Sequence, residues 1–201
     1  MPAFTIRKGS ACVADQVDSG LSIEQIDTLS IVSLKVPRNA IDAARDKYQL
    51  AKPSQIAGSD PRSLWLGPDR WLLTSDTLSP AAIIDSCGMA LDGILHYAVD
   101  YSSGLTLMRI VGPDARQLLE TGTGTDLRPA RFPVNSCCRT RFAQIAAVIV
   151  AAAPDSYDVY VDRSYGAYLA NWVAESSSMY SSYTPTESRS GEPTNKVKTS
   201  A

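Results

Sequence analysis

The chain has 201 residues and a mass of 21.6 kDa, enough for one domain or for two small halves that share a core. Nineteen Lys and Arg against 21 Asp and Glu leave no cationic field, which argues against a nucleic-acid partner. No apolar run approaches the roughly 18 residues of a membrane span, and MPAFTIRKGS lacks the apolar block of a secretory signal. We therefore expect a soluble, cytoplasmic protein with no membrane partner.

Composition divides the chain into three parts. Residues 1–20 have no sustained hydrophobic period and are expected to form an irregular N-terminal arm. Residues 21–175 carry the periodic apolar segments of a folded domain. Residues 176–201 are rich in Ser, Thr and Pro with almost no aliphatic side chains, which predicts a disordered tail.

The first half of the domain begins with a strand at 28–36, where apolar residues alternate with small or polar ones until Pro37. A short helix is expected at 39–48. Two apolar pieces, 64–66 and 70–74, flank a Gly-Pro-Asp turn and predict a β-hairpin. Ser79 as N-cap and Pro80 at the first helical position then predict a helix that runs to about Leu91.

The second half follows the same rules. Segments 97–101 and 105–111 are predicted to form a second hairpin around Ser102-Ser103-Gly104. Gly112-Pro113-Asp114 opens a helix that ends near Gly122, with the Asp114 charge at its positive end. Three strands are expected at 138–142, 145–150 and 157–161, followed by a helix capped by Ser164 whose buried stripe contains Tyr168, Leu169, Trp172 and Val173.

An internal repeat connects the two halves. Gly67-Pro68-Asp69-Arg70-Trp71-Leu72-Leu73 and Ala153-Pro154-Asp155-Ser156-Tyr157-Asp158-Val159 share a Pro-Asp turn, then an aromatic residue, then an aliphatic one on the same strand face. Each copy precedes a capped helix. The pattern predicts an α+β fold made of two pseudo-repeated ferredoxin-like halves with antiparallel sheets and packed helices. Trp71 and Trp172, one from each copy, are expected to be buried.

The residues that could carry chemistry are few. His96 is the one histidine, which excludes mechanisms that need two, and it is expected to have no task. Adjacent Cys137 and Cys138 lack the spacing of a zinc knuckle and are expected, like Cys12 and Cys87, to be reduced structural thiols rather than a redox pair. Gly122-Thr123-Gly124-Thr125 has no Lys and follows a helix, unlike a phosphate loop.

Two segments could contact a partner. The arm carries Phe4, Ile6 and Val13, apolar residues for which the domain has no evident need. Four arginines also lie close together in sequence and could pair with a partner's carboxylates, although a solvated face is the simpler interpretation; they are Arg128, Arg131, Arg139 and Arg141.

Four segments together resemble a known family: WLGPDRWLL, RIVGPDARQLLETGTGTDL, FPVNSCCRTRFAQIAAVIV and SYDVYVDRSYGAYLANWV. Over roughly residues 64–174 they are similar to the gamma subunit of heterotetrameric sarcosine oxidase and to the wider superfamily of the glycine-cleavage T-protein. The resemblance implies the folate-binding fold of that superfamily. The Gly-Pro-Asp-Ala turn at 112–115, Asp126-Leu127 and the hairpin at 141–150 fall where that pattern requires.

One departure from the T-protein pattern bears on function. The aminomethyltransferases of the superfamily carry an Asp pair at the tip of the hairpin, whereas the aligned positions here are Ala146 and Ala147. A methyl group cannot accept a proton or stabilise a cation. We therefore expect no catalytic, cofactor-binding or metal-binding residue in this chain. As the resemblance implies, FAD, FMN, NAD, tetrahydrofolate and zinc would belong to other subunits.

The expected function is that of a non-catalytic gamma subunit. The resemblance implies alpha, beta and delta subunits as partners, in a complex that oxidises sarcosine to glycine, transfers a one-carbon unit to tetrahydrofolate and forms hydrogen peroxide. Two alternatives stay open: a free-standing folate-binding one-carbon protein, and the equivalent subunit of another N-methyl amino acid dehydrogenase.

Overall fold

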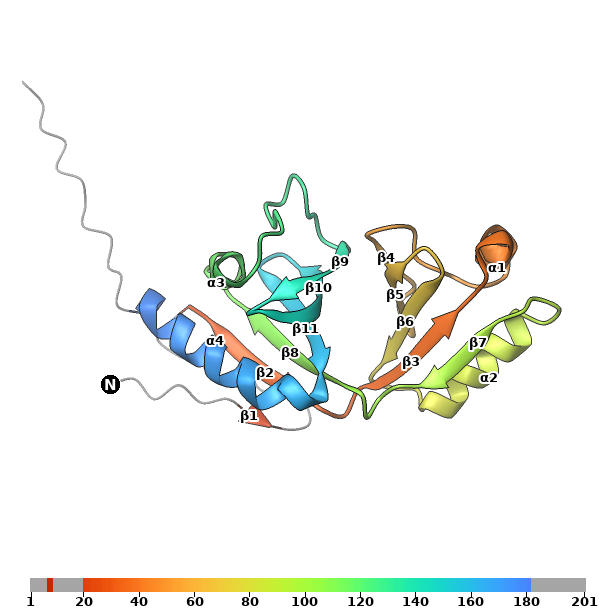
Figure 1. Cartoon of the computed structure of the whole chain (residues 1–201), viewed down its shortest axis with the longest axis horizontal. Helices are drawn as coiled ribbons and strands as arrows, with labels where there is room; N and C mark the ends of the chain where they lie inside the picture. Colours follow the sequence, from red (N-terminus) through yellow and green to blue (C-terminus); the bar gives the residue numbers. More distant parts are fainter. Residues whose placement is uncertain (1–6, 9–19, 182–201) are drawn as a thin grey trace, which may run out of the picture.

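The computed structural model describes residues 7–8 and 20–181. Two largely antiparallel sheets lie side by side, each with helices on one face, and their other faces turn toward one another (Figure 1). The expected arm at 1–20 and tail at 176–201 fall mostly outside the described residues. No helix within 7–8 and 20–181 is long and apolar enough to cross a membrane.

The first half of the chain forms the sheet ordered β4-β5-β6-β3-β7. Strand β3 lies between β6 and β7 and is antiparallel to both. Without the short β4, the succession β3-α1-β5-β6-α2-β7 is the βαββαβ pattern of a ferredoxin-like unit. The bounds are β3 Ser30–Lys35, α1 Ile41–Lys47, β4 Ile56–Ala57, β5 Arg62–Gly67, β6 Arg70–Ser75, α2 Pro80–Ala90 and β7 Tyr97–Asp100.

The second half forms the sheet ordered β1-β2-β8-β11-β10-β9. Strand β8 is central and lies antiparallel to both β2 and β11. A short 3-10 turn, η2, leads into the last helix. The bounds are β1 Arg7–Lys8, β2 Ser22–Ile26, β8 Leu105–Val111, α3 Ala115–Gly122, β9 Cys137–Phe142, β10 Ile145–Ala153, β11 Ser156–Asp162, η2 Arg163–Tyr165 and α4 Gly166–Ser181.

The two sheets are pseudo-repeats with one exchanged strand. Strand β8 corresponds to β3, β10 and β11 correspond to β5 and β6, and α3 and α4 correspond to α1 and α2. The place that β7 takes beside β3 is taken beside β8 by β2, which comes from the N-terminal side of the first half. The prediction of two ferredoxin-like halves is confirmed, and the exchange means that the halves are interlocked.

The Pro-Asp turns of the repeat close equivalent hairpins, β5–β6 and β10–β11. Trp71 and Tyr157, which follow the turns, are both buried on the face that meets the helices. Asp155 occupies the left-handed region at φ 52°, a conformation that Asp tolerates better than most residues. The same local chemistry therefore builds the same hairpin twice.

Three apolar clusters hold the molecule together. One lies between the second sheet and α3 and α4, and one between the first sheet and α1 and α2. The third joins the two sheets and draws Ile31, Leu64 and Leu72 from the first half against Leu107, Val150 and Tyr160 from the second. The region between the sheets is thus part of the core and also the place where the cavities described below open.

The predicted hairpin at 97–111 is wrong, although both of its strands exist. Strand β7 pairs with β3 in the first sheet, whereas β8 pairs with β2 and β11 in the second. The intervening residues 101–104 carry the chain from one sheet to the other. Three described strands that the sequence did not predict, β1, β2 and β4, span two, five and two residues, too short to show a clear period.

Helix α4 also differs from expectation. Asp162 caps the 3-10 turn η2 that leads into α4: its carboxylate accepts from the Ser164 amide at 2.9 Å, and Ser164 lies inside this turn. Trp172 is half-buried and packs edge-on against Phe142 with ring centroids 5.0 Å apart, while Leu169 and Val173 are fully buried. The helix runs to Ser181, beyond the expected end of the folded domain at residue 175.

The Gly-Pro-Asp turn before α3 has a steric purpose. Gly112 has φ 139°, and a Cβ at this position would lie 1.8 Å from the carbonyl oxygen of Gly20. Only glycine allows so close a backbone approach. The turn thereby fits against the residue that leads into β2.

Candidate functional site

Two cavities open between the sheets, and β6 contributes to both. Thr74 and Ser75 line the first cavity, of about 520 Å³, and Arg70 and Leu72 line the second, of about 470 Å³. Because these residues belong to different ends of one strand, the cavities lie at different ends of the contact between the sheets. The chemistry of their linings differs.

A buried ion pair lies beside the first cavity, which its two arginines, Arg62 and Arg109, help to line. Asp158 of β11 is fully buried, and Arg109 of β8 donates to its two oxygens at 2.7 and 3.1 Å. Arg62 of β5 donates to the same carboxylate at 3.4 Å. The hydrogen bonds that Arg109 donates to Asp158 raise the pKa of Arg109, and burial opposes this effect. The bidentate contact with Arg109 lies within the second sheet, and the single contact with Arg62 connects the same carboxylate to the first sheet, which is a structural use of charge.

The second cavity, which we call the basic cavity, is lined by Lys35, Arg70 and Arg139. No carboxylate in the described part of the chain lies within ion-pair distance of these three cations. Asp162 also lines the cavity, but its carboxylate accepts from Ser164. The cations are therefore available to an anionic group from outside the described residues.

A buried tyrosine completes the basic cavity. Tyr160 is 1% exposed, and its hydroxyl makes no hydrogen bond within the described residues. Burial raises the pKa of this phenol to about 12. The group therefore stays neutral at physiological pH and is unsuited to act as a base.

The hairpin positions at which the superfamily carries carboxylates also lie here. Ala146 is exposed and lines the basic cavity, while Ala147 is buried in the core beneath α3 and α4. Both belong to β10, where they pair with Arg141 and Thr140 of β9. The wall of the cavity therefore presents the methyl group of Ala146, one of the two positions where the resemblance to the T-protein predicts that an acid is missing.

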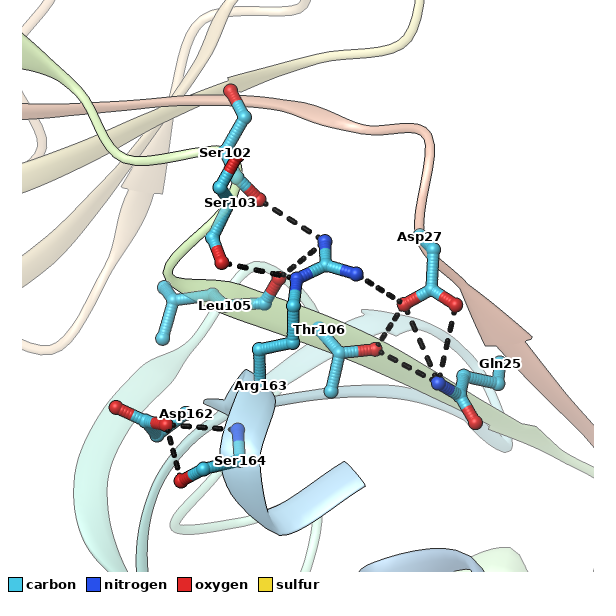
Figure 2. Close-up of polar contacts among 9 residues, drawn as sticks. All are labelled: Gln25, Asp27, Ser102, Ser103, Leu105, Thr106, Asp162, Arg163 and Ser164. Carbon is cyan, nitrogen blue, oxygen red and sulfur yellow. Dashed lines mark hydrogen bonds and ion pairs between the residues drawn. The ribbon is translucent and has the colours of Figure 1, made fainter. Parts of the chain in front are cut away.

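A network of hydrogen bonds and one ion pair holds the two segments of the chain that cross from one sheet to the other. Figure 2 shows the Arg163 guanidinium donating to the carbonyls of Ser102, Ser103 and Leu105 at 3.0–3.2 Å. It also forms an ion pair with Asp27 at 3.3 Å, and Thr106 donates to the same carboxylate at 2.7 Å. Asp27 follows β2, residues 102–104 precede β8, and Leu105 begins it, so the Arg163 side chain connects both segments that lead from one sheet to the other. Sequence reasoning missed this role because the partners are distant in the chain.

The cysteines and the histidine show no catalytic geometry. Cys137 belongs to the cluster between the sheets, whereas Cys138 packs toward α3 and α4, so the adjacent side chains point to opposite faces of β9. Burial raises the pKa of Cys137 to about 12. Cys87 is also a buried free thiol, and Cys12 lies outside the described residues. One ring nitrogen of His96 lies 2.8 Å from the Ile94 carbonyl.

The remaining sequence candidates do not converge. Arg128 pairs with Asp126 in its own loop at 2.6 Å and holds the pKa of that carboxyl at about 2. Arg139 reaches the basic cavity, and Arg141 donates to the Gln144 carbonyl. Thr123 and Thr125 hydrogen-bond to each other and lie within hydrogen-bonding distance of Thr140 rather than forming a phosphate loop. Residues 7–8 and 20–181 contain no cluster of His, Cys, Asp and Glu able to hold a metal ion.

Solved structures define the fold class. The glycine cleavage system aminomethyltransferase T from Bartonella henselae is similar with a TM-score of 0.59 at 12% identity, over 77% of this chain and 45% of that chain. A chain of the heterotetrameric sarcosine oxidase from Corynebacterium sp. U-96, in complex with pyrrole 2-carboxylate, is similar with a TM-score of 0.73 at 23% identity. The similarity covers 85% of this chain and 90% of that chain. The molecule therefore has a T-protein-like fold.

Sequence comparison then identifies the family. Sarcosine oxidase subunit gamma of Corynebacterium sp. strain U-96 is 27% identical over 144 residues, 71% of this chain and 69% of the relative. The homologues from strain P-1 and from Arthrobacter sp. are 25% and 26% identical, with 58% and 59% of their lengths aligned. The model of the sarcosine oxidase, gamma subunit family matches residues 46–179. This chain belongs to the sarcosine oxidase gamma subunit family, as its motifs predicted.

Proposed function

We propose that this chain is the non-catalytic gamma subunit of a cytoplasmic heterotetrameric sarcosine oxidase, with alpha, beta and delta subunits as partners. The family match over residues 46–179 is the observation that carries the proposal. The complex would oxidise the N-methyl group of sarcosine to give glycine, a one-carbon unit on tetrahydrofolate and hydrogen peroxide. FAD, FMN, NAD, tetrahydrofolate and zinc would be bound by the other subunits.

The residues that line the cavities favour a non-catalytic, structural role for this chain. The basic cavity offers cations and a neutral tyrosine, and Ala146 stands where an acid is needed for folate-dependent transfer. The two arginines that line the first cavity, Arg62 and Arg109, are both engaged with the buried Asp158 carboxylate. The hydrogen bonds and packing described above hold two interlocked sheets, which suits a rigid chain that arranges larger neighbours.

Co-expression with the other three subunits tests the proposal. We expect the chain to co-purify with them and to be required for a complex of full size on gel filtration. A stable free chain that never associates with the flavin-binding subunits would contradict it. Micromolar affinity of the isolated chain for tetrahydrofolate, measured by calorimetry, would instead favour a free-standing one-carbon protein. Genomic neighbours that encode another N-methyl amino acid dehydrogenase would favour the equivalent subunit of that enzyme.

The N-terminal arm is the first candidate for the contact with the large subunits. We predict that deletion of residues 2–20 reduces co-purification, because the deletion removes apolar residues suited to a neighbour's surface. Arg131→Ala should reduce it less, since one exposed cation contributes little. A chain that ends at Ser181 is the matched control for loss of a terminus and should assemble fully. Full assembly of the arm-deleted chain would place the interface elsewhere.

A further inference from the structure

Strand β7 is the last strand of its sheet and has no neighbour on its outer side within the described residues (Figure 1). The Tyr101 amide donates to the Ile31 carbonyl of β3 at 2.7 Å. Bonding groups alternate along a strand, so the peptide groups of Ala98 and Asp100 point away from β3. These outward N–H and C=O groups form an open edge.

The other half of the molecule shows what such an edge accepts. Strand β2 holds the place beside β8 that β7 holds beside β3. The outer edge of β2 is covered by β1, with Arg7 opposite Glu24 and Lys8 opposite Gln25 in a parallel pairing. The equivalent edge of β7 is open. Unprotected edges of this kind recruit further strands.

The two faces beside the β7 edge differ in chemistry. On the helix side, Met89 and Leu95 are 76% and 77% exposed, and Met89 lines a shallow groove with Ile84 and Ala98. On the other side, the pairing of Tyr97 with Lys35 places Tyr97 above the basic cavity. A strand added here would turn successive side chains alternately toward an apolar surface and toward unpaired cations.

We propose that an extended segment of a partner polypeptide pairs with the β7 edge as an additional strand, with apolar residues toward α2 alternating with acidic residues toward the basic cavity. The partner is one of the other subunits, and in this respect the inference rests on the proposed function. A second copy of the chain suits the edge less well. Pairing of two β7 strands in the antiparallel sense would bring two sets of Lys35, Arg70 and Arg139 side by side.

A peptide tests the edge without the other subunits. The probe is a labelled peptide that alternates Val and Glu, with a peptide that alternates Val and Lys as its control, and binding is measured by fluorescence anisotropy. We expect the peptide that alternates Val and Glu to bind and the peptide that alternates Val and Lys not to bind. Ala98→Pro removes one outward N–H and should weaken binding about tenfold. Equal binding of both peptides, or binding of neither, would overturn the inference.

Two charge variants with matched controls separate the faces. Met89→Asp and Arg139→Glu should each weaken peptide binding several-fold. Met89→Asp places a charge against the Val side chains of the peptide, and Arg139→Glu repels its Glu side chains. Val134→Asp, at an exposed apolar residue in the other half, and Arg131→Glu, at an exposed arginine in the loop before β9, should leave it unchanged. Equal losses in the test variants and their controls would mean that the peptide binds elsewhere.

Hydrogen exchange of the assembled wild-type complex gives a readout that needs no variant to fold. The amides of Ala98 and Asp100 should become protected on assembly, while those of exposed loops stay fast. If the chain binds the Glu peptide but does not assemble with the other subunits, the proposed function fails and so does the assignment of the partner, while the strand-accepting edge at β7 stands. If it assembles with no protection at β7, the inference fails and the proposed function stands. A β7-dependent homodimer on gel filtration would likewise overturn the inference.

Discussion

At the scale of single residues, the polar groups buried between the sheets differ in whether their hydrogen bonds are satisfied. Asp158 accepts hydrogen bonds from two arginines and is satisfied, whereas the hydroxyls of Tyr160 and Thr74 are buried and interact with each other without a hydrogen bond of normal geometry. An unsatisfied buried hydroxyl costs roughly 1–3 kcal/mol of stability. Tyr160 is therefore a place where the core could be more stable than it is.

We predict that Tyr160→Phe increases the free energy of unfolding by about 1 kcal/mol at pH 7, measured by urea denaturation. The pH dependence should also change. Burial raises the pKa of the folded-state phenol from 10.0 to about 12, so the folded chain holds this proton more tightly than the unfolded chain does. That contribution is complete below pH 10 and is lost as the pH rises toward 12.

The wild-type chain should therefore lose more stability than Tyr160→Phe between pH 10 and 12. The comparison between the two proteins cancels other groups that titrate in this range, such as Tyr48 and Cys137. A destabilised Tyr160→Phe variant at pH 7 would show that the hydroxyl has a partner that stabilises it.

At the scale of elements, the two halves use their tryptophans differently. Trp71 on β6 is fully buried and donates its indole N–H to the Ala51 carbonyl at 2.9 Å. Trp172 on α4 is half-buried and contacts Phe142. The repeat is thus accurate for strands and hairpins and less so for the helix that closes each unit.

We predict that Trp71→Ala costs about 3–5 kcal/mol of stability, the usual range for a buried aromatic side chain. Trp172→Ala should cost less, about 2 kcal/mol, because part of its ring is already in water and the rest includes one aromatic pair. Thermal and urea unfolding of the two variants provides the comparison. Equal losses would mean that α4 packs more deeply than the structure shows.

The turn before α3 gives a second prediction at this scale. Gly112→Ala should destabilise the chain by well over about 1 kcal/mol, because φ 139° and the nearby Gly20 carbonyl leave no space for a Cβ. Gly124→Ala is the matched control, since a Cβ there meets nothing within 4 Å. Similar unfolding midpoints for the two variants would show that the Gly20 segment moves aside without cost.

The elements also show what sequence reasoning can reach. Helix α2 was predictable because Ser79 caps it through the Ala82 amide and Pro80 occupies its first turn, all within one local segment. The partners of β7 and β8 were not, because a Gly-containing turn between two strands has the same appearance whether it closes a hairpin or carries the chain to another sheet. The basic cavity was missed for the same reason: Lys35, Arg70 and Arg139 meet only in the tertiary structure.

At the scale of the whole molecule, the exchanged strand makes the two sheets mutually dependent. The second sheet needs β2, and β2 is joined to the first sheet through Asp27 and the segment that leads to β3. Asp158 and the apolar cluster between the sheets add contacts across the same boundary. The chain should therefore unfold as one cooperative unit.

We predict that a fragment of residues 102–181 shows no cooperative thermal transition by circular dichroism, because the outer edge of β8 lacks its partner. The same fragment extended by a Gly-Ser linker and residues 20–27 should regain one. A cooperative transition of equal midpoint in both fragments would mean that β2 is dispensable for the second sheet.

The pairing of Ser22 with Val111 also imposes an order of events during synthesis. Strand β2 leaves the ribosome before any strand of the first sheet, yet β8 follows only after all of them. At roughly 5–20 residues per second, β2 waits on the order of several seconds to over ten seconds for its neighbour. A slowly translated or weakened β8 should lower the yield of folded chain through aggregation of the nascent polypeptide, even where the finished protein is fully stable.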